Sequence, residues 1–265
     1  MKKINIILVS ILTISFSFYS ESSYSKSNFK DYKKISKAQS ISFNEDLDYY
    51  NKYIGQKLLF AIKQNKVIVP EYIKNYITNL SNYGYVNFNG SKAYLSKPLI
   101  DLLYSLINSK QITKDNPLSI LSLFRKGRNH GALEKDGIVV CRAVDIDIYS
   151  GFRINMNNPN DALKGIVRII NNMPEGRYNI GLPRPGGGQL IAPDKDFFLP
   201  VTNLNQNEVS PTGSIDTDLK LIKNQEAREL ITNAVKNNKM AKILYLMPDA
   251  VDHVHIKALD DNKLY

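Results

Sequence analysis

The stretch that decides the fold covers residues 138–148 and reads Ile-Val-Val-Cys-Arg-Ala-Val-Asp-Ile-Asp-Ile. Most of its side chains are β-branched or apolar, which is typical of a β-strand. Because alternate side chains of a strand share a face, we expect Asp145 and Asp147 on one face and the intervening apolar residues on the other. Two like charges this close repel each other unless a cation lies near them.

A second strand with the same alternation is expected over residues 252–259. His253 and His255 share one face of this strand, and Val254 and Ile256 point into a core. Two imidazoles with this spacing can reach a single polar site.

The third histidine of the chain, His130, follows an apolar strand expected over residues 119–124. Two histidines and one carboxylate, with an open coordination position, form a common catalytic zinc set. Zinc makes hydroxide available near neutral pH, and a nearby carboxylate must then accept the proton. Asp252, three residues before His255, is placed for that role.

Each of these features has a purely structural interpretation when it is taken alone. The histidine pair is then a satisfied surface pair, the two aspartates mark a solvated strand edge, and His130 belongs to a loop. The combination favours a zinc site, because a chain with only three histidines places all of them in these clusters.

Three segments of the sequence together resemble a known family. They are Ser-Leu-Phe-Arg-Lys-Gly-Arg-Asn-His-Gly at residues 122–131, Arg-Ala-Val-Asp-Ile-Asp at 142–147 and Asp-His-Val-His at 252–255. They resemble the zinc peptidases of bacterial cell-wall metabolism, which include D-alanyl-D-alanine carboxypeptidases and dipeptidases, penicillin-insensitive murein endopeptidases and phage endolysins related to the lysostaphin and hedgehog group. The resemblance extends over residues 117–257.

The resemblance implies a role for each charged residue of these segments. The implied Zn²⁺ ligands are His130, Asp145 and His255. Asp252 is the implied general base, Arg125 contacts substrate carbonyls or the anionic intermediate, and His253 assists beside the metal. Asp147 is the alternative to Asp145 as a ligand, and Asp145 is preferred because an alanine precedes it by two positions, as in the family.

The sequence departs from the family pattern in three places. His130 and Asp145 lie farther apart than in the family, and residues 133–140 would account for the difference if they formed a hairpin around the turn-like Glu-Lys-Asp-Gly at 134–137. Arg128 replaces the serine that normally precedes the histidine, and the chain has no tryptophan, so the one often found beside the last histidine is missing.

The first residues predict export. Lys2 and Lys3 precede an apolar run of about 15 residues, which is short for a membrane span and typical of a signal peptide. Cleavage is expected after Ser25, or alternatively after Ser22, so residues 1–25 are interpreted as a signal peptide. The uncleaved N-terminal anchor is the other interpretation. We expect a secreted or periplasmic protein without stable membrane insertion after removal of the signal.

Composition limits the remaining functions. With 35 Lys and Arg against 25 Asp and Glu, the net charge is +10, which favours contact with anionic wall polymers. The basic residues are scattered and form no nucleic-acid-binding motif, so we expect no nucleic-acid partner. The single cysteine, Cys141, excludes an internal disulfide and a cysteine-rich zinc ribbon, and we expect it to be a buried small apolar residue.

The other periodicities predict an α+β fold in which a small antiparallel sheet bears the zinc site and helices flank it, as in the hedgehog and D-Ala-D-Ala-peptidase group. A mostly helical region over 26–115 precedes a zinc peptidase domain over 116–265. Helices are expected over 47–61, 69–80, 98–109, 161–172 and 219–237, a hairpin over 85–95, a strand over 241–247, and a glycine- and proline-rich loop over 181–200 whose Arg184 is a candidate substrate contact.

The function that we expect is zinc-dependent hydrolysis of amide bonds in peptidoglycan stem peptides or cross-links, with a murein-endopeptidase-like action. A D,D- or L,D-carboxypeptidase of the same fold is the alternative enzyme. A non-catalytic basic protein that binds the cell wall is the alternative from a different class.

Overall fold

A computed structural model describes residues 43–88, 90–124, 133–135, 137–155, 158–174, 176, 178–183, 225–237, 242–246 and 252–259. Residues from Phe43 onward group into one compact unit. Its helices and sheets confirm the expected α+β class. The expected signal peptide over 1–25 and the residues Arg125, His130 and Arg184 lie outside the described residues.

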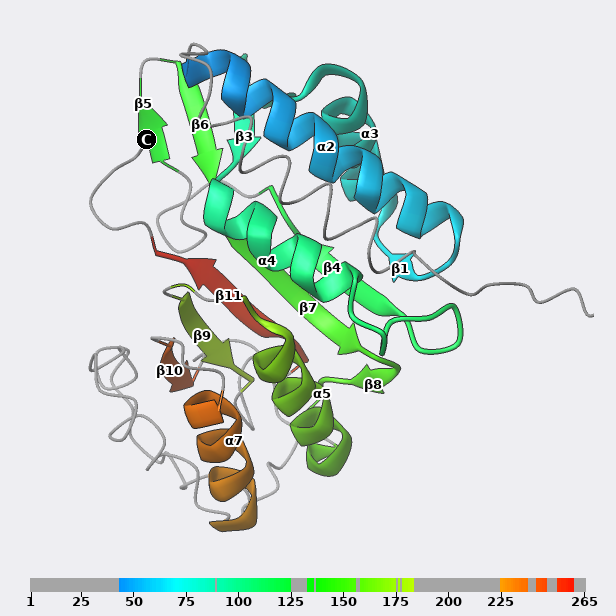
Figure 1. The fold of residues 1–265 in the computed structure, drawn as a ribbon, viewed down its shortest axis with the longest axis vertical. Coiled ribbons are helices and arrows are strands. Elements are labelled where there is room, and N and C mark those ends of the chain that lie inside the picture. Colours follow the sequence, from blue (N-terminus) through cyan, green and yellow to red (C-terminus); the bar gives the residue numbers. More distant parts are fainter. Residues whose placement is uncertain are drawn as a thin grey trace, which may run out of the picture. The chain divides into compact units, whose positions relative to one another are not determined.

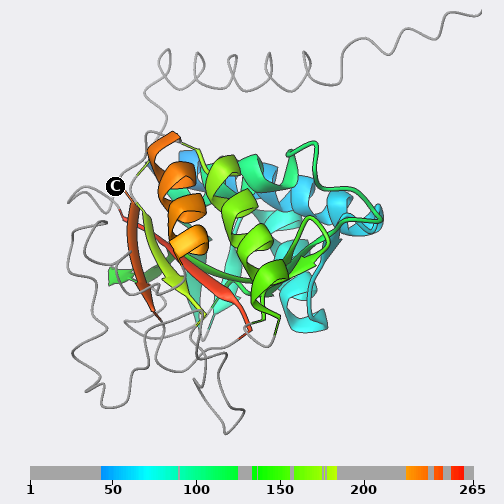
Figure 2. The same ribbon diagram turned by 90° about the horizontal axis from the view of Figure 1, so that it is seen from below.

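The helices of the described part form a row in which each one contacts the next. They are α2 (Phe43–Lys63), α3 (Glu71–Tyr83), α4 (Lys97–Ile107), α5 (Pro159–Asn172) and α7 (Gln225–Asn237). The order of contacts is α3, α2, α4, α5, α7, and Figure 2 shows α4, α5 and α7 over the same side of the larger sheet. None of the described helices has the length and apolar character that spanning a bilayer requires.

The larger sheet combines antiparallel strands in its middle with parallel pairs at both edges. Its strands are β1 (Val67–Ile68), β4 (Leu118–Ser122), β7 (Ala143–Tyr149), β8 (Phe152–Arg153), β9 (Tyr178–Leu182), β10 (Lys242–Leu246) and β11 (Val254–Ala258). The order is β1-β4-β7-β11-β9-β10, with β8 beside β7 (Figure 1). β1 is parallel to β4 and β9 to β10, and the other neighbours are antiparallel.

The expected antiparallel pairing is therefore found in the middle of the sheet, whereas it was wrong for the pairs at the two edges. A parallel pair needs a long crossover connection, and both edge pairs have one, because helices α3 and α4 lie between β1 and β4 and helix α7 lies between β9 and β10.

The smaller sheet contains two hairpins joined by a parallel pair. Its strands are β2 (Val86–Phe88), β3 (Ser91–Leu95), β5 (Leu133–Lys135) and β6 (Ile138–Cys141), in the order β2-β3-β6-β5. The expected hairpin over 85–95 is confirmed as β2 and β3. Residues 133–140, which would account for the long spacing if they formed a hairpin, do contain one, made of β5 and β6, and Gly137 has a φ of 74° in its turn. β6 also pairs with β3, so this hairpin is part of the second sheet rather than a free extension.

Residues 138–148 form two strands of different sheets instead of the single strand expected. β6 ends at Cys141 and β7 begins at Ala143. The backbone N–H of Ser96 donates to the carbonyl of Cys141, whereas that of Ala258 donates to the carbonyl of Arg142. Consecutive carbonyls thus bond to different elements. The burial expected for Cys141 is confirmed.

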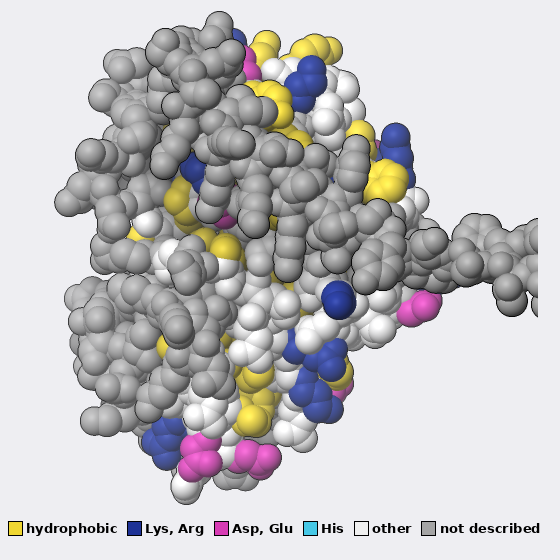
Figure 3. Space-filling view, viewed as in Figure 1, with side chains coloured by type: hydrophobic (Ala, Val, Ile, Leu, Met, Phe, Trp, Pro, Cys, Tyr) yellow, Lys and Arg dark blue, Asp and Glu magenta, His cyan; other side chains and the backbone are white. Residues whose placement is uncertain are grey.

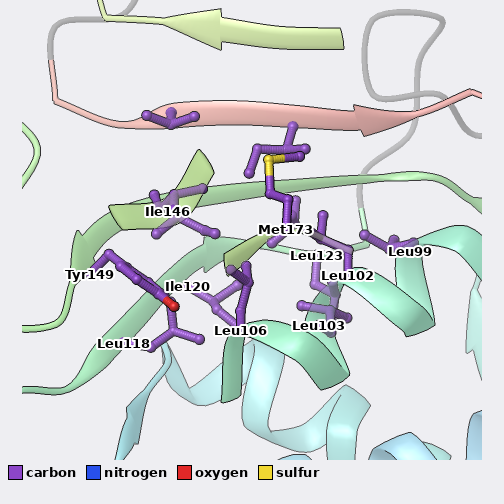
Figure 4. Close-up of a cluster of buried hydrophobic side chains, with 14 of the residues drawn as sticks. Leu99, Leu102, Leu103, Leu106, Leu118, Ile120, Leu123, Ile146, Tyr149 and Met173 are labelled. Atoms are coloured by element: carbon purple, nitrogen blue, oxygen red, sulfur yellow. The ribbon is translucent and has the colours of Figure 1, made fainter. Parts of the chain in front are cut away.

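The core lies between helix α4 and the middle of the larger sheet. Figure 4 shows leucines of α4 packed against Ile120 and Ile146, and the side chains of Leu102, Leu103 and Leu106 are fully buried. Ser96 precedes α4 as its N-cap residue, and its side chain accepts a hydrogen bond from the backbone N–H of Leu99, 3.4 Å away. Burial of these apolar side chains fixes the strands that carry the polar residues of the opposite sheet face.

Candidate metal centre

Asp145 and His255 lie directly opposite each other on the neighbouring antiparallel strands β7 and β11. The register is set by the apolar face, where Val254 pairs with Ile146 and Ile256 is fully buried. A slip of one residue would bring the polar side chains into the core, so the hydrophobic pattern holds the pair in register. Residues 110 positions apart in sequence are thereby placed side by side.

The two side chains form a buried hydrogen bond. Nδ1 of His255 lies 2.7 Å from Oδ1 of Asp145, and the residues are only 5% and 2% exposed. Such burial of an imidazole and a carboxylate is costly unless they are paired or bind a cation. The pair is therefore the polar centre of this sheet face.

His253 and Asp252 lie next to this pair. Nε2 of His253 is 4.0 Å from Oδ1 of Asp145, and Nδ1 of His253 shares a 2.9 Å hydrogen bond with Oδ1 of Asp252. The His253 side chain is 19% exposed and that of Asp252 is 58% exposed. His253 precedes the first residue of β11, Val254. These residues form a chain of contacts that runs from the surface at Asp252 to the buried carboxylate of Asp145.

The structure separates the two aspartates of β7. Asp145 contacts both histidines of the His-x-His segment. Oδ1 of Asp147 is buried and has no hydrogen-bond partner among the described residues. Of the two candidate carboxylates, the geometry places Asp145 beside His255.

Two further residues lie in the same row as Asp145 and His255, where a row is the set of residues paired with one another across neighbouring strands. Ser122 of β4 pairs with Asp145, and Gly181 of β9 pairs with His255. Residues 181–200 were expected to form a loop, but β9 extends through Gly181 and Leu182 because Tyr178, Ile180 and Leu182 alternate into the core. Gly181 leaves His255 without a neighbouring side chain on that strand.

Lys257 and Asn179 lie at the next level along the strands on the same face, and neither was predicted from the sequence. Lys257 pairs with Ala143 on one side and with Asn179 on the other. Burial, and to a smaller extent the Arg142 guanidinium, lowers the pKa of Lys257. Lys257 could have been found from sequence, because it follows His255 by two positions on the same strand. Asn179 could not, because its pairing depends on the position of β9.

Two of the predicted site residues are not placed by the structure. Arg125 and His130 lie outside the described residues, so the third implied ligand is not placed. Within the described ranges, no group of three or more His, Cys, Asp and Glu side chains is arranged to hold a metal. Burial raises the pKa of the Cys141 thiol to about 12, in keeping with a packing role for this side chain.

Charge on the visible surface is distributed rather than gathered. On the face drawn in Figure 3, lysine and arginine side chains lie in small separate groups among acidic, apolar and other side chains.

Comparison with known proteins adds no assignment: no family model matches the chain, and neither the curated proteins nor the solved structures give a significant match.

The donor atoms of the pair fit a zinc ion after a small displacement. Two nitrogen or oxygen ligands of a tetrahedral zinc ion lie about 3.3 Å apart, whereas Nδ1 of His255 and Oδ1 of Asp145 lie 2.7 Å apart. The side chains would separate by roughly 0.6 Å on binding, and the proton that they share would be lost. Imidazole and carboxylate are both common zinc ligands.

Proposed function

We propose that this protein is an exported zinc-dependent hydrolase that cleaves amide bonds in peptidoglycan stem peptides or cross-links, on a fold of the hedgehog and D-Ala-D-Ala-peptidase type. The observation that carries the proposal is the buried contact between Asp145 and His255, with His253 and Asp252 beside it. These four residues come from two of the three segments whose motifs resemble the cell-wall zinc peptidases.

Three residues are proposed to hold the metal. They are Asp145, His255 and His130. When bound, zinc supplies an activated water and polarises the carbonyl under attack. The burial of Asp145 and His255 supports this assignment, because a dry site strengthens the attraction between a carboxylate and a cation.

Proton transfer is assigned to Asp252 together with His253. The 2.9 Å hydrogen bond from His253 Nδ1 to Asp252 directs the opposite nitrogen, Nε2, toward Asp145. The exposed Asp252 carboxylate can exchange protons with solvent, and as general base it would accept the proton of the attacking water and deliver it to the leaving amine. Arg125 is proposed to stabilise the oxyanion, with His253 as the second donor.

The partners follow from export and charge. Peptidoglycan peptides are the proposed substrate, and the net charge of +10 would draw the protein to anionic polymers of the wall. We propose no nucleic-acid partner and no stable membrane insertion after removal of residues 1–25.

The first experiment measures zinc by elemental analysis in the purified protein and in His255→Ala. About one zinc per chain in the first and little in the second is expected. The same preparations are then incubated with muropeptides, and products are identified by mass. Asp252→Ala should retain zinc and lose most hydrolysis, since a general base contributes about 10²–10⁴-fold.

Two results would refute the proposal. Absence of zinc from both proteins after metal addition at neutral pH would leave a wall-binding protein as the better hypothesis, to be checked by sedimentation with purified peptidoglycan. Equal cleavage by the wild-type protein and Asp252→Ala would remove Asp252 from the mechanism.

A further inference from the structure

Four tyrosines and two lysines gather where helices α2 and α4 contact each other. The rings of Tyr49 and Tyr50 lie edge to face, with centroids 6.1 Å apart. Tyr53 of α2 lies beside Tyr104 of α4, with centroids 6.0 Å apart and ring planes inclined by 32°. Together with one lysine from each helix they form what we call the tyrosine–lysine surface, which consists of Tyr49, Tyr50, Tyr53, Lys57, Lys97 and Tyr104.

The two lysines lie over tyrosine rings of α2. Nζ of Lys57 is 5.4 Å from the centroid of the Tyr53 ring, and Nζ of Lys97 is 6.0 Å from that of Tyr50. A cation at such a distance is attracted by the ring. Lys97 also pairs with Asp101 over 2.8 Å, but both side chains are partly exposed, and an exposed pair of this kind contributes little to stability. Both ammonium groups therefore stay close to the rings and can contact an anion from outside.

The outer side of α2 carries rings that the core does not use. Ile54 and Leu58 are fully buried on the inner side of the helix, whereas Tyr49 is 57% exposed and Phe60 is 60% exposed. Tyr49 and Phe60 are about three turns apart and lie on the same face, with Tyr53 between them. Figure 3 shows apolar and basic side chains next to each other over α2. Because exposed apolar rings bring no gain to the fold, such a stripe marks an interaction surface.

The chemistry of these side chains fits a sugar polymer that carries negative charge. The face of a tyrosine ring packs against the apolar face of a sugar ring, while its hydroxyl group exchanges hydrogen bonds with sugar hydroxyls. Lysine supplies the charge that pairs with carboxylate or phosphate groups. A lipid surface fits less well, because the tyrosine hydroxyls would lose hydrogen bonds among acyl chains. The net charge of +10 acts in the same direction, since it draws polyanions to the protein.

The tyrosine–lysine surface lies away from the candidate metal centre. Helix α4 packs on the sheet face that carries Ile120 and Ile146 (Figure 4). Asp145 precedes Ile146 on β7 and so faces the other side of the sheet, where it pairs with His255. A polymer held by α2 and α4 would thus leave the polar face of the sheet open to a substrate.

We propose that the tyrosine–lysine surface binds an anionic polysaccharide, with sugar rings stacked on the tyrosines and anionic groups paired with Lys57 and Lys97. The inference rests on the proposed function, because export brings the protein to the anionic polymers of the wall. It adds the place on the molecule where such a polymer is held, and it assigns that role to the helices rather than to the face that carries the candidate metal centre.

The test measures the binding of three polymers to the purified protein by calorimetry. Polygalacturonate has sugar rings and carboxylates, dextran has sugar rings without charge, and polyglutamate has carboxylates without sugar rings. The variants of the surface are Tyr49→Ala, Tyr53→Ala and a double variant that combines Lys57→Gln with Lys97→Gln. Thermal unfolding checks that each variant is folded, and the largely exposed Tyr49 provides a substitution that leaves the core untouched.

The matched controls are Tyr72→Ala and Lys74→Gln, which remove exposed side chains of α3. They change the same residue types outside the tyrosine–lysine surface, so they should bind all three polymers as the wild-type protein does. A loss in the controls equal to the loss in the surface variants would overturn the assignment to α2 and α4.

The wild-type protein should bind polygalacturonate at least about tenfold more tightly than dextran or polyglutamate, because only this polymer engages rings and lysines together. Tyr49→Ala and Tyr53→Ala should each weaken the binding of polygalacturonate by about five- to tenfold through lost stacking, and they should leave the binding of polyglutamate unchanged. The double lysine variant should weaken the binding of both anionic polymers.

Two results would overturn the surface. The first is equal binding of polygalacturonate by the wild-type protein and both tyrosine variants. The second is tighter binding to phosphatidylglycerol vesicles than to polygalacturonate, measured by sedimentation and lost in Tyr49→Ala, which would indicate a membrane-binding surface instead.

The outcomes also separate this inference from the function on which it rests. His255→Phe should bind polygalacturonate as the wild-type protein does, because the two sites lie on different sides of the sheet. Binding that depends on Tyr53, in a protein that neither holds zinc nor cleaves muropeptides, would support the surface and contradict the hydrolase. Cleavage of muropeptides without binding of polygalacturonate would overturn the surface and leave the hydrolase intact.

Discussion

The buried pair Asp145–His255 allows a sharp prediction about coupling within the candidate centre. We consider a double-mutant cycle with Asp145→Ala, His255→Phe and the double variant in metal-free protein. The 2.7 Å hydrogen bond joins residues that are 2% and 5% exposed, and a hydrogen bond to a charged group contributes about 1.5–3 kcal/mol. The coupling energy should therefore be about 2 kcal/mol.

The assay is urea unfolding with chelator present, since the cycle isolates the pairwise energy from other effects of each substitution. The control cycle uses Lys97 and Asp101, an exposed pair at 2.8 Å on helix α4. Exposed pairs of this spacing contribute about 0.3–0.5 kcal/mol. A coupling for Asp145 and His255 no larger than that of the control would refute the structural reasoning.

The same cycle tests the metal assignment when zinc is added. Zinc at about 100 times its dissociation constant should stabilise the wild-type protein by about 2.7 kcal/mol, which raises Tm by roughly 5–10 °C for a unit of this size. None of the three variants should show this shift. An equal shift in His255→Phe would mean that zinc binds elsewhere.

Three further predictions concern the fold. Leu103 is fully buried in α4, so Leu103→Ala should lower the free energy of unfolding, measured by urea titration, by about 2–5 kcal/mol. A decrease below about 1 kcal/mol would contradict the packing described. Gly84 has a φ of 81°, and a Cβ there would overlap the backbone oxygen of Asp48. Gly84→Ala should therefore lower the free energy of unfolding, again measured by urea titration, by about 2–4 kcal/mol. An unchanged free energy of unfolding would argue against the close approach of Gly84 to Asp48. Because burial raises the pKa of the Cys141 thiol from 9.0 to about 12, the unfolded chain loses this proton first, and stability should fall as pH rises from about 9 toward 12, by up to about 1.4 kcal/mol per pH unit. Cys141→Ala should show a shallower decline, and parallel declines in the two proteins would disprove this contribution.

Local patterns predicted most of the described elements. The three- and four-residue spacing of apolar side chains predicted the helices that appear as α2 and α4. The Asn-Gly turn predicted the hairpin of β2 and β3, and the turn-like Glu-Lys-Asp-Gly at 134–137 indicated where the hairpin of β5 and β6 could form. These elements were predictable because helix periodicity and turn chemistry depend on residues a few positions apart.

The break at Arg142 was not predictable in the same way. The residues on either side of it are equally suited to a strand, so propensity gives no sign of an interruption. It marks a change of sheet, because β6 pairs with β3 whereas β7 pairs with β4 and β11, and these partners are far away in sequence. The parallel edges of the larger sheet have a similar origin, since the pairing of β1 with β4 depends on how the helices between them pack.

The sequence by itself determined which residues could carry chemistry and which face of each strand they occupy. Two-residue alternation placed His255 opposite the apolar Val254 and Ile256, and it separated Asp145 from Ile146. Only the tertiary structure decided that Asp145 faces His255, that Gly181 lies on the other side of the histidine, and that Lys257 meets Asn179. Strand alternation is a property of neighbouring residues, whereas register across a sheet is set by burial of the apolar faces against helices from elsewhere in the chain.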